Sequence, residues 1–432
     1  MVPREHVCAR PPPRYRTPTA EGVRCRTFIF APDPVDPIVD PRCNAGTLRV
    51  LALTTLYPNG ADPGHAPFNR QQFAELSQRV QLEVMAVVPW RFGRALGRAK
   101  THEIPLHERL DGVAVHHPRF VTLPGLAPLN VGLMGASLLP QIIKRRLQGR
   151  RYDVILGAYA FPDGCAAITL AKALRVPVVV KCHGSDLNRV PQQPILRAQV
   201  SALLPRADRV VVVSKKLGET AQDLGVSADK IDLVYNGINR ERFCIRDRAQ
   251  ARRKLGLPAQ GPIVLYVGTL ATHKGAQDLL DAASVLHKLR PDVRVAFVGD
   301  GPLADAVKSA PANVLALGRR SHAEVAEYMH ACNLLCLPSW DEGMPNVVRE
   351  AHACGRPVVA TEVGGIPEAV HRPELGQLVP SKAPERLVEA LMIQLDGPEV
   401  APEQIVAMAE VPTWPESADA LAQSLARAAG RM

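Results

Sequence analysis

The chain has 432 residues, of which 47% are hydrophobic and 22% charged, and its formal net charge is +10. This length exceeds that of one ordinary domain and predicts two, in a soluble globular protein. Only 4% of the residues are aromatic, and no basic segment interleaves with them, so a nucleic-acid-binding protein is the least favoured class. The nine cysteines include no C-x-x-C pair, which argues against a disulfide framework or a zinc knuckle and favours a reducing cytoplasm.

Residues 1–46 are rich in proline and arginine. They contain no apolar core of the length that a secretory signal needs. We therefore expect residues 1–46 to be a disordered N-terminal extension, or the result of a start codon assigned too early.

From Leu48 onward, short β-branched runs alternate with helical patterns. This alternation is typical of a parallel sheet whose two faces are covered by helices. We expect residues 47–240 to form one doubly wound, Rossmann-like domain. Its strands are predicted at residues 48–54, 82–88, 152–156, 176–180 and 209–213.

The stretch from Phe120 to Ile143 carries no charge and is long enough to span a bilayer. Its three prolines and three glycines argue against a spanning helix. Basic residues follow directly at 144–146 and 150–151. A helix that lies in the membrane interface and a core helix with a solvated basic end both remain open.

The positive charge is concentrated in the front half of the chain. Residues 1–245 contain 33 Lys and Arg against 20 Asp and Glu, whereas residues 246–432 contain 19 against 22. This asymmetry indicates an anionic partner for the first domain, with plain solubility as the alternative. Membrane lipid and a diphosphate-linked substrate are favoured over nucleic acid.

A second series of strands and helices begins at Pro262. We therefore predict an α/β protein with two doubly wound domains: a linker at 241–260, a second Rossmann-like domain at 261–400 and C-terminal helices at 401–432. The strands of the second domain are predicted at 262–267, 293–298, 313–317, 334–337 and 357–361. Ligands of such sheets bind at the carboxyl ends of the strands, and two facing sheets would enclose a cleft.

The first-domain segment His183-Gly184-Ser185-Asp186 ends a predicted strand, which places His183 and Asp186 at the mouth of that cleft. A histidine there can hydrogen-bond a substrate hydroxyl or move a proton. A structural histidine is the alternative.

Lys274 follows the first strand of the second domain, after Gly268 and Thr269, where a helix is predicted to begin. The helix macrodipole contributes about 0.3 to 1 kcal/mol to an anion at that point, and the lysine adds a direct charge, so phosphate would bind well. A solvated surface lysine is the alternative.

The segment Gly299-Asp300-Gly301-Pro302 follows a predicted strand, as a dinucleotide fingerprint would. A NAD site also needs an acidic residue at the end of the next strand, to hold the ribose. That strand ends in Gly318-Arg319-Arg320 instead. We therefore reject a dehydrogenase and interpret Gly299–Pro302 as a turn that brings the backbone close to a ligand or a neighbouring helix.

Glu342 and Glu350 lie eight positions apart around a Gly343-Met344-Pro345 turn that is predicted to open a helix. Gly343 permits close approach of a ligand, and Pro345 has its φ preset for a first helical turn. Carboxylates and free amides suit a polyhydroxylated ligand. An ordinary capped helix with solvated glutamates is the alternative.

Cys332 and Cys336 are four positions apart near His330, a spacing that suggests a metal site. Cys336, however, lies inside the apolar run 333–337. We therefore interpret both as buried thiols and predict no metal site.

Together, five ordered motifs resemble glycosyltransferase family 4, the retaining enzymes with the GT-B fold. The resemblance covers roughly residues 48–391, and its first-domain details, such as Leu56-Tyr57-Pro58, look most like the subgroup that builds bacterial surface polysaccharides of the teichuronic-acid type. The motifs are His183–Asp186, Tyr235–Ile238, Val267–Leu270 with Lys274–Gly275, Gly299–Pro302, and Glu342–Pro345 with Glu350.

The resemblance implies a role for each matching residue. Lys274 would hold the diphosphate of a nucleoside diphosphate sugar, Glu350 the ribose hydroxyls, and Arg319 would sit beside the base. Glu342 would face the donor sugar, and His183 would meet the same sugar from the first domain. The catalytic set is thus His183, Lys274 and Glu342, and the donor-binding set is Gly268, Thr269, Lys274, Gly301, Arg319, Glu342, Gly343, Met344, Pro345 and Glu350.

Two features qualify this assignment. The family often has Arg or Asn where this chain has Thr269, so one phosphate contact is weaker or comes from elsewhere. The chain also has no D-x-D pair at the motifs, which fits transfer without a metal ion, because cationic side chains and helix ends can neutralise the leaving diphosphate.

The predicted activity is transfer of a hexose from a UDP or GDP sugar to a hydroxyl of a growing, lipid-linked glycan, with retained anomeric configuration and no cofactor. The acceptor is expected on the side of the first domain. The enzyme is expected in the cytoplasm, peripheral on the inner face of the bacterial plasma membrane and held there by the basic first domain. A sugar-nucleotide epimerase or hydrolase and a non-catalytic sugar-nucleotide sensor are the alternatives.

Overall fold

The front half of the chain forms the largest sheet. The computed structural model describes residues 47–91, 104–123 and 125–431, so the expected N-terminal extension lies outside the described residues. Eight strands pair in the order β10-β9-β8-β7-β1-β2-β5-β4; β4 runs antiparallel to β5, and the other neighbours run parallel. They are β1 (Arg49–Thr54), β2 (Gln81–Ala86), β4 (His107–Leu110), β5 (Val113–His116), β7 (Val154–Gly157), β8 (Val178–Cys182), β9 (Arg209–Val212) and β10 (Ile231–Leu233).

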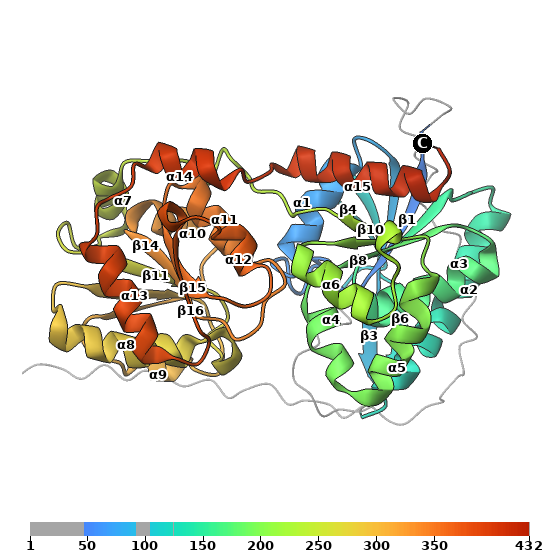
Figure 1. The fold of residues 1–432 in the computed structure, drawn as a ribbon. Coiled ribbons are helices and arrows are strands. Elements are labelled where there is room, and N and C mark those ends of the chain that lie inside the picture. Colours follow the sequence, from blue (N-terminus) through green and yellow to red (C-terminus); the bar gives the residue numbers. More distant parts are fainter. Residues whose placement is uncertain (1–46, 92–103, 124, 432) are drawn as a thin grey trace, which may run out of the picture. The chain divides into compact units, whose positions relative to one another are not determined.

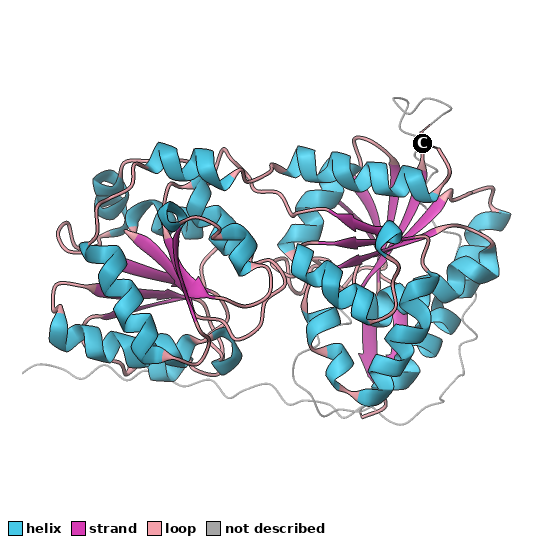
Figure 2. Ribbon diagram, viewed as in Figure 1, coloured by secondary structure: helices cyan, strands magenta, loops and turns pink. Residues whose placement is uncertain are grey.

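Both faces of this sheet are covered by helices (Figure 2). Successive residues of β1 point to opposite faces, so Leu51 packs in one core with Leu138 of α2, whereas Ala52 packs in the other with Phe73 of α1. A short pair of parallel strands, β3 and β6, lies outside the main sheet. The helices are α1 (Pro67–Leu76), α2 (Asn130–Leu147), α3 (Cys165–Leu174), α4 (Ser185–Asn188), α5 (Pro194–Leu203) and α6 (Lys215–Asp223), and the short strands are β3 (Val88–Arg91) and β6 (Arg119–Thr122).

The second sheet has six strands, all parallel, in the order β13-β12-β11-β14-β15-β16. The strand order reverses between β11 and β14, which makes their carboxyl ends the switch point where ligands of such sheets bind. The two sheets confirm the predicted α/β class with two doubly wound halves (Figure 1). The strands are β11 (Ile263–Val267), β12 (Arg294–Val298), β13 (Val314–Gly318), β14 (Leu334–Leu337), β15 (Val358–Thr361) and β16 (Gly376–Val379).

The helices of the second half lie on both faces of its sheet. Leu265 of β11 packs with Met329 of α10, and Tyr266 packs with Leu279 of α8. The stretch 241–260, expected as a linker, contains α7, which packs against α10. The helices are α7 (Arg248–Leu255), α8 (Ala276–Leu289), α9 (Ala304–Lys308), α10 (His322–Ala331), α11 (Asn346–Ala353), α12 (Ile366–Ala369), α13 (Pro384–Asp396) and α14 (Pro402–Ala409).

The last helix, α15 (Trp414–Ala428), returns to the first sheet. Its Leu421 and Leu425 lie in the same core as Phe73 of α1. The segment before α15 lies beside the segment that first leads from the first sheet to α7. The Ile238 amide donates to the Pro412 carbonyl at 3.0 Å. The chain therefore joins its two halves through two neighbouring segments.

A buried glutamate anchors α2 to the first sheet. Glu83 of β2 accepts hydrogen bonds from Arg145 Nε at 2.8 Å, Arg150 Nη1 at 3.1 Å and Tyr152 Oη at 2.8 Å. Burial alone would raise the pKa of Glu83, but His116, Arg145 and Tyr152 outweigh burial and hold the pKa below its usual range. Arg145 and Arg150 of the basic run are therefore structural partners of this carboxylate.

The uncharged stretch from Phe120 to Ile143 does not form one continuous helix. It runs through β6, a single 3₁₀ turn at Ala127–Leu129 and most of α2. In the part of the chain that the structure describes, no helix combines the length and the hydropathy needed to cross a bilayer.

Candidate functional site

Lys274 lies at the switch point of the second sheet. It ends the 3₁₀ turn Thr272–Lys274 after β11, and Gly275, with φ of 67°, leads into α8. A Cβ on Gly275 would overlap the carbonyl of Pro338, which follows β14, so only glycine lets these two loops meet. The sequence thus places the ammonium of Lys274 beside the loop that carries Glu342.

Lys274 and Glu342 form an ion pair. Lys274 Nζ donates to Glu342 Oε1 at 2.7 Å, and Ser339 Oγ donates to the same oxygen at 2.8 Å. The side chain of Glu342 is 13% exposed and that of Lys274 is 28% exposed. Because the ion pair already orders the Lys274 side chain, binding an anionic ligand there loses little further side-chain entropy.

The turn after Glu342 packs tightly against the end of β8. A Cβ on Gly343 would overlap the carbonyl of His183, and a Cβ on Gly184, whose φ is 136°, would overlap the backbone of Gly343. Asn188 Nδ2 also donates to the Glu342 carbonyl at 3.1 Å. The structure therefore brings His183 and the Glu342 segment together, although they lie far apart in the sequence.

The imidazole of His183 is half-buried, and its Nε2 atom is buried. Its Nε2 has no hydrogen-bond partner among the described residues, and its ring lies 4.8 Å from the ring of Phe68, measured between centroids. Burial, with a smaller effect of the Lys181 charge, holds the His183 pKa well below its usual range. His183 is therefore a neutral ring whose Nε2 has no hydrogen-bond partner among the described residues.

Asp186 acts on the backbone of this loop. Its carboxylate accepts from the amides of Ala160, His183 and Gly184 at 2.7 to 3.2 Å. The acidic residue that the sequence places at the mouth of a cleft thus shapes the turn that presents His183.

Glu350 occupies a different environment from Glu342. It lies on α11, is 8% exposed, and its Oε1 is 2.8 Å from Nε2 of His322 at the start of α10. The helix begins at Asn346, with Pro345 just before it rather than inside its first turn. The two glutamates therefore have different partners and do not pair with each other.

The side chain of Met344 lies in the protein core. Its side chain is 7% exposed and packs into the core on the α2 side of the first sheet, in the same cluster as Leu187 and Leu217. Only its backbone can therefore face a ligand, which is the contact that the resemblance implies.

Arg319, predicted beside a base, extends into solvent from the end of β13. Its side chain is 69% exposed, and Nη2 lies 3.5 Å from Oδ1 of Asp62 in the loop before α1.

The other predicted glycines have backbone roles. The Gly268 amide donates to the Val298 carbonyl, and a Cβ on Gly301 would overlap the Leu270 carbonyl. The Thr269 carbonyl accepts from Tyr266 Oη at 2.9 Å.

Two family models match the chain. One, described as glycosyltransferase family 4, covers residues 57–242, and the other, described as glycosyl transferases group 1, covers residues 261–396. TuaC of Bacillus subtilis, assigned to teichuronic acid biosynthesis as a glycosyltransferase, is 31% identical over 373 residues, which span 82% of this chain and 92% of TuaC. This chain belongs to glycosyltransferase family 4. The predicted family, its teichuronic-acid-type likeness and the transferase class are thereby confirmed.

Other relatives of this family 4 glycosyltransferase agree. D-inositol 3-phosphate glycosyltransferase 1 of Catenulispora acidiphila is 30% identical over 387 residues, or 82% of this chain and 87% of that protein. Among solved structures, Anabaena HepE in complex with UDP aligns with a TM-score of 0.66 and 22% identity over 88% of this chain and 100% of HepE. Sucrose-phosphate synthase of Thermosynechococcus elongatus aligns with a TM-score of 0.64 and 21% identity over 89% of this chain and 97% of that protein. These likenesses confirm the predicted GT-B fold.

The loop at Gly364 and Gly365 supports the Glu342 segment and was not predicted from the sequence. The Gly365 amide donates to the Gly343 carbonyl at 2.8 Å, and a Cβ on Gly364 would overlap the Glu342 carbonyl. Glu368, three residues later, accepts from the amides of Lys215 and Lys216, both at 2.9 Å. A Gly-Gly pair directly after a strand, followed by an acidic residue, was the signal available in the sequence.

A buried polar network near the chain crossings was also missed. Lys181 of β8 is fully buried and donates to Gln72 Oε1 and to Asn236 Oδ1, the latter at 3.2 Å. Asn236 in turn donates to Asn346, the first residue of α11, at 3.2 Å. Burial lowers the pKa of Lys181 to about 7. The network links the first sheet to the helix that carries Glu350.

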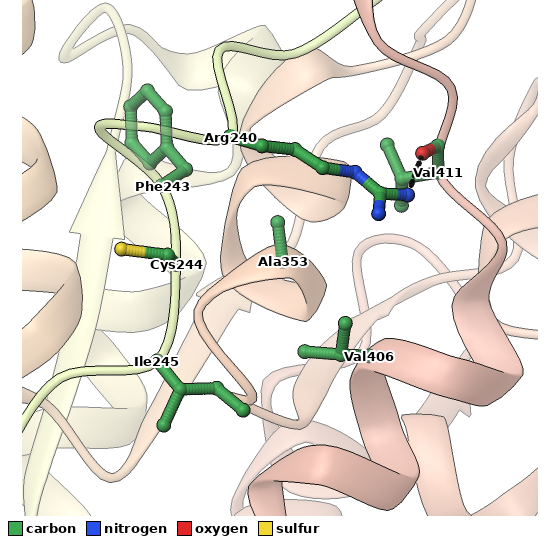
Figure 3. Close-up of a pocket in the computed structure, with 7 residues that line it drawn as sticks. All are labelled: Arg240, Phe243, Cys244, Ile245, Ala353, Val406 and Val411. Carbon is green, nitrogen blue, oxygen red and sulfur yellow. Dashed lines mark hydrogen bonds between the residues drawn. The ribbon is translucent and has the colours of Figure 1, made fainter.

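The structure also contains an apolar cavity of about 220 Å³ (Figure 3). Arg240 at its edge donates through Nη2 to the Val411 carbonyl at 2.6 Å. None of the predicted site residues lines it, but the ring of its lining residue Phe243 lies 4.9 Å from the ring of His322, the partner of Glu350. The lining residues are Arg240, Phe243, Cys244, Ile245, Ala353, Val406 and Val411.

The described residues contain no group of three or more His, Cys, Asp or Glu side chains that could hold a metal ion. Cys332 and Cys336 are both fully buried, and burial raises the pKa of Cys332 to about 11. Both thiols therefore stay protonated and pack in the core.

Proposed function

We propose that this family 4 glycosyltransferase moves a hexose from a UDP or GDP sugar to a hydroxyl of a growing, lipid-linked surface glycan, without a metal ion. The observation that carries the proposal is the Lys274–Glu342 pair at the switch point between β11 and β14. An ammonium at that point suits a diphosphate, and a carboxylate beside it suits the hydroxyls of the attached sugar.

The remaining residues fit one extended donor. Glu350 would accept hydrogen bonds from the ribose hydroxyls while its Oε1 stays in contact with His322 Nε2. Arg319 would lie beside the base. Neutral His183 would bond the sugar through its free Nε2. The complexes of HepE with UDP and with UDP-glucose support a donor of this kind for a protein of the same fold.

In the proposed reaction the bond between the anomeric carbon and the diphosphate oxygen breaks. The acceptor hydroxyl oxygen bonds to the same face of that carbon, and its proton passes to the departing diphosphate oxygen. Lys274 would stabilise the charge that develops on the diphosphate, and no side chain needs to act as a nucleophile. Retention of configuration follows from attack on the face that the leaving group vacates.

The acceptor proposal rests on TuaC, whose name places it in teichuronic acid biosynthesis. A lipid-linked acceptor would present its hydroxyls at a membrane, so we place the enzyme in the cytoplasm, peripheral on the inner face of the plasma membrane. The excess of basic residues before residue 246 supports an anionic surface as its partner.

Nucleoside diphosphate binding tests the donor half of this proposal. In calorimetric titrations with UDP, GDP and ADP, we expect one of the three nucleotides to bind best. Glu350→Gln should lower the affinity for that nucleotide about 10-fold, since a hydrogen bond to a charged group is lost. Glu389→Gln, which changes an exposed side chain of α13 in the same half, is the matched control and should bind like the wild type. Equal affinity of Glu350→Gln and the wild type would remove Glu350 from the ribose site.

A further inference from the structure

One side of α2 exposes an unbroken row of apolar residues. Three large members are well exposed: Leu129 by 49%, Ile143 by 43% and Leu147 by 84%. The spacing of three and four residues keeps the row on one side of the helix. The row, named here the apolar stripe, consists of Leu129, Gly132, Ala136, Pro140, Ile143 and Leu147, all of them exposed.

The apolar stripe is not part of the protein core. The core side of α2 is formed by Met134, Leu138 and Ile142, each fully buried against the first sheet. When a helix is apolar on both its core side and its outer side, the outer side marks a surface that binds a protein or a membrane. Leu126, 49% exposed in the segment just before α2, extends the same apolar surface.

The charge around the apolar stripe favours an anionic lipid surface. Residues 112–152 contain no Asp or Glu. Exposed Arg146 lies beside Leu147, and exposed Arg151 follows α2. Arg145 and Arg150 are taken up by Glu83, so the basic run supplies less free charge than its sequence suggests.

We propose that the apolar stripe inserts into the interface of a membrane that carries anionic headgroups, with Arg146 and Arg151 at headgroup level. An interfacial helix gains most of its affinity from buried apolar area and a smaller part from charge. The inference rests on the proposed function, because a lipid-linked acceptor presents its hydroxyls at that surface. It differs from docking through the basic run alone, since the apolar side chains supply most of the affinity.

The test is co-sedimentation of the full chain with phosphatidylglycerol-containing vesicles. The stripe variant combines Leu129→Gln, Ile143→Gln and Leu147→Gln and should lose at least about 10-fold in vesicle affinity. The matched control replaces three exposed apolar residues of the second half, Val285→Gln, Leu289→Gln and Ile393→Gln, which are 44%, 58% and 61% exposed. It should bind like the wild type.

Two further readouts separate the possible failures. Nucleoside diphosphate affinity should be the same in the wild type and both variants, which confirms folding and tests the proposed donor site independently of membranes. Wild-type chain that ignores the vesicles, or a stripe variant that binds them as well as the wild type, would overturn the proposal. So would a wild-type dimer in light scattering that the stripe variant converts to monomer without any vesicle binding, because a second copy would then cover the stripe.

Discussion

Lys274→Ala is expected to lower kcat/KM for the sugar donor by about 100- to 1,000-fold, the usual loss when one preorganised charge-stabilising donor is removed. The ammonium lies 2.7 Å from Glu342 at the switch point, where the departing diphosphate would develop its charge. Because the effect concerns the transition state, the loss should appear mainly in kcat. Initial rates of nucleoside diphosphate release in the presence of acceptor measure it.

The control for this variant is Lys308→Ala. Lys308 belongs to the same half of the chain, pairs with Asp305 and has a side chain that is 66% exposed. It should retain the wild-type rate. Since Lys274→Ala also leaves Glu342 without its cation, the double variant Lys274→Ala/Glu342→Gln removes the unpaired charge and should stay slow while its thermal stability recovers. A Lys274→Ala enzyme that turns over like the wild type would contradict the proposed site.

Glu83→Gln is expected to destabilise the first half of the chain by about 3 kcal/mol at pH 7, because Arg145 stays buried without its carboxylate. For a unit of this size the melting temperature should fall by about 6 to 12 °C. Glu389→Gln, which breaks an exposed ion pair with Arg386, should cost less than about 1 kcal/mol and is the control.

The pH dependence of this difference has a defined sign. The pKa of Glu83 is lower in the folded chain than in the unfolded chain. Its contribution to stability is therefore complete above the unfolded value of about 4.3 and is lost as the pH falls towards the folded value. Melting curves of wild type and Glu83→Gln should converge as the pH drops below about 4.3. A gap that widens towards acid would contradict the assigned role of Glu83.

The sequence predicts the alternation of elements well because strands and helices are local patterns. The runs at 262–267 and 334–337 were expected as strands, and β11 and β14 lie there. Their adjacency, which brings Lys274 to Glu342, is a property of strand order and has no local signature. The motif resemblance assigns both residues to one donor molecule, but it does not predict the ion pair between them.

Long-range partners escaped prediction for the same reason. Glu83, an acidic residue inside a β-branched run, signals a need for buried partners, but nothing local names Arg145 and Tyr152. The antiparallel pair of β4 and β5 and the return of α15 to the first sheet were likewise not predicted. Met344 faces the core because tertiary packing, not its turn sequence, decides where its side chain lies.

The central claim is that this enzyme transfers sugar from a nucleoside diphosphate donor to a glycan hydroxyl. The most direct measurement follows radiolabelled sugar from the preferred donor, with and without a lipid-linked glycan acceptor and without added metal. The account predicts acceptor-dependent release of nucleoside diphosphate and label covalently joined to the acceptor. Donor that is hydrolysed or epimerised equally well without acceptor, or donor that binds and is never consumed, would contradict it.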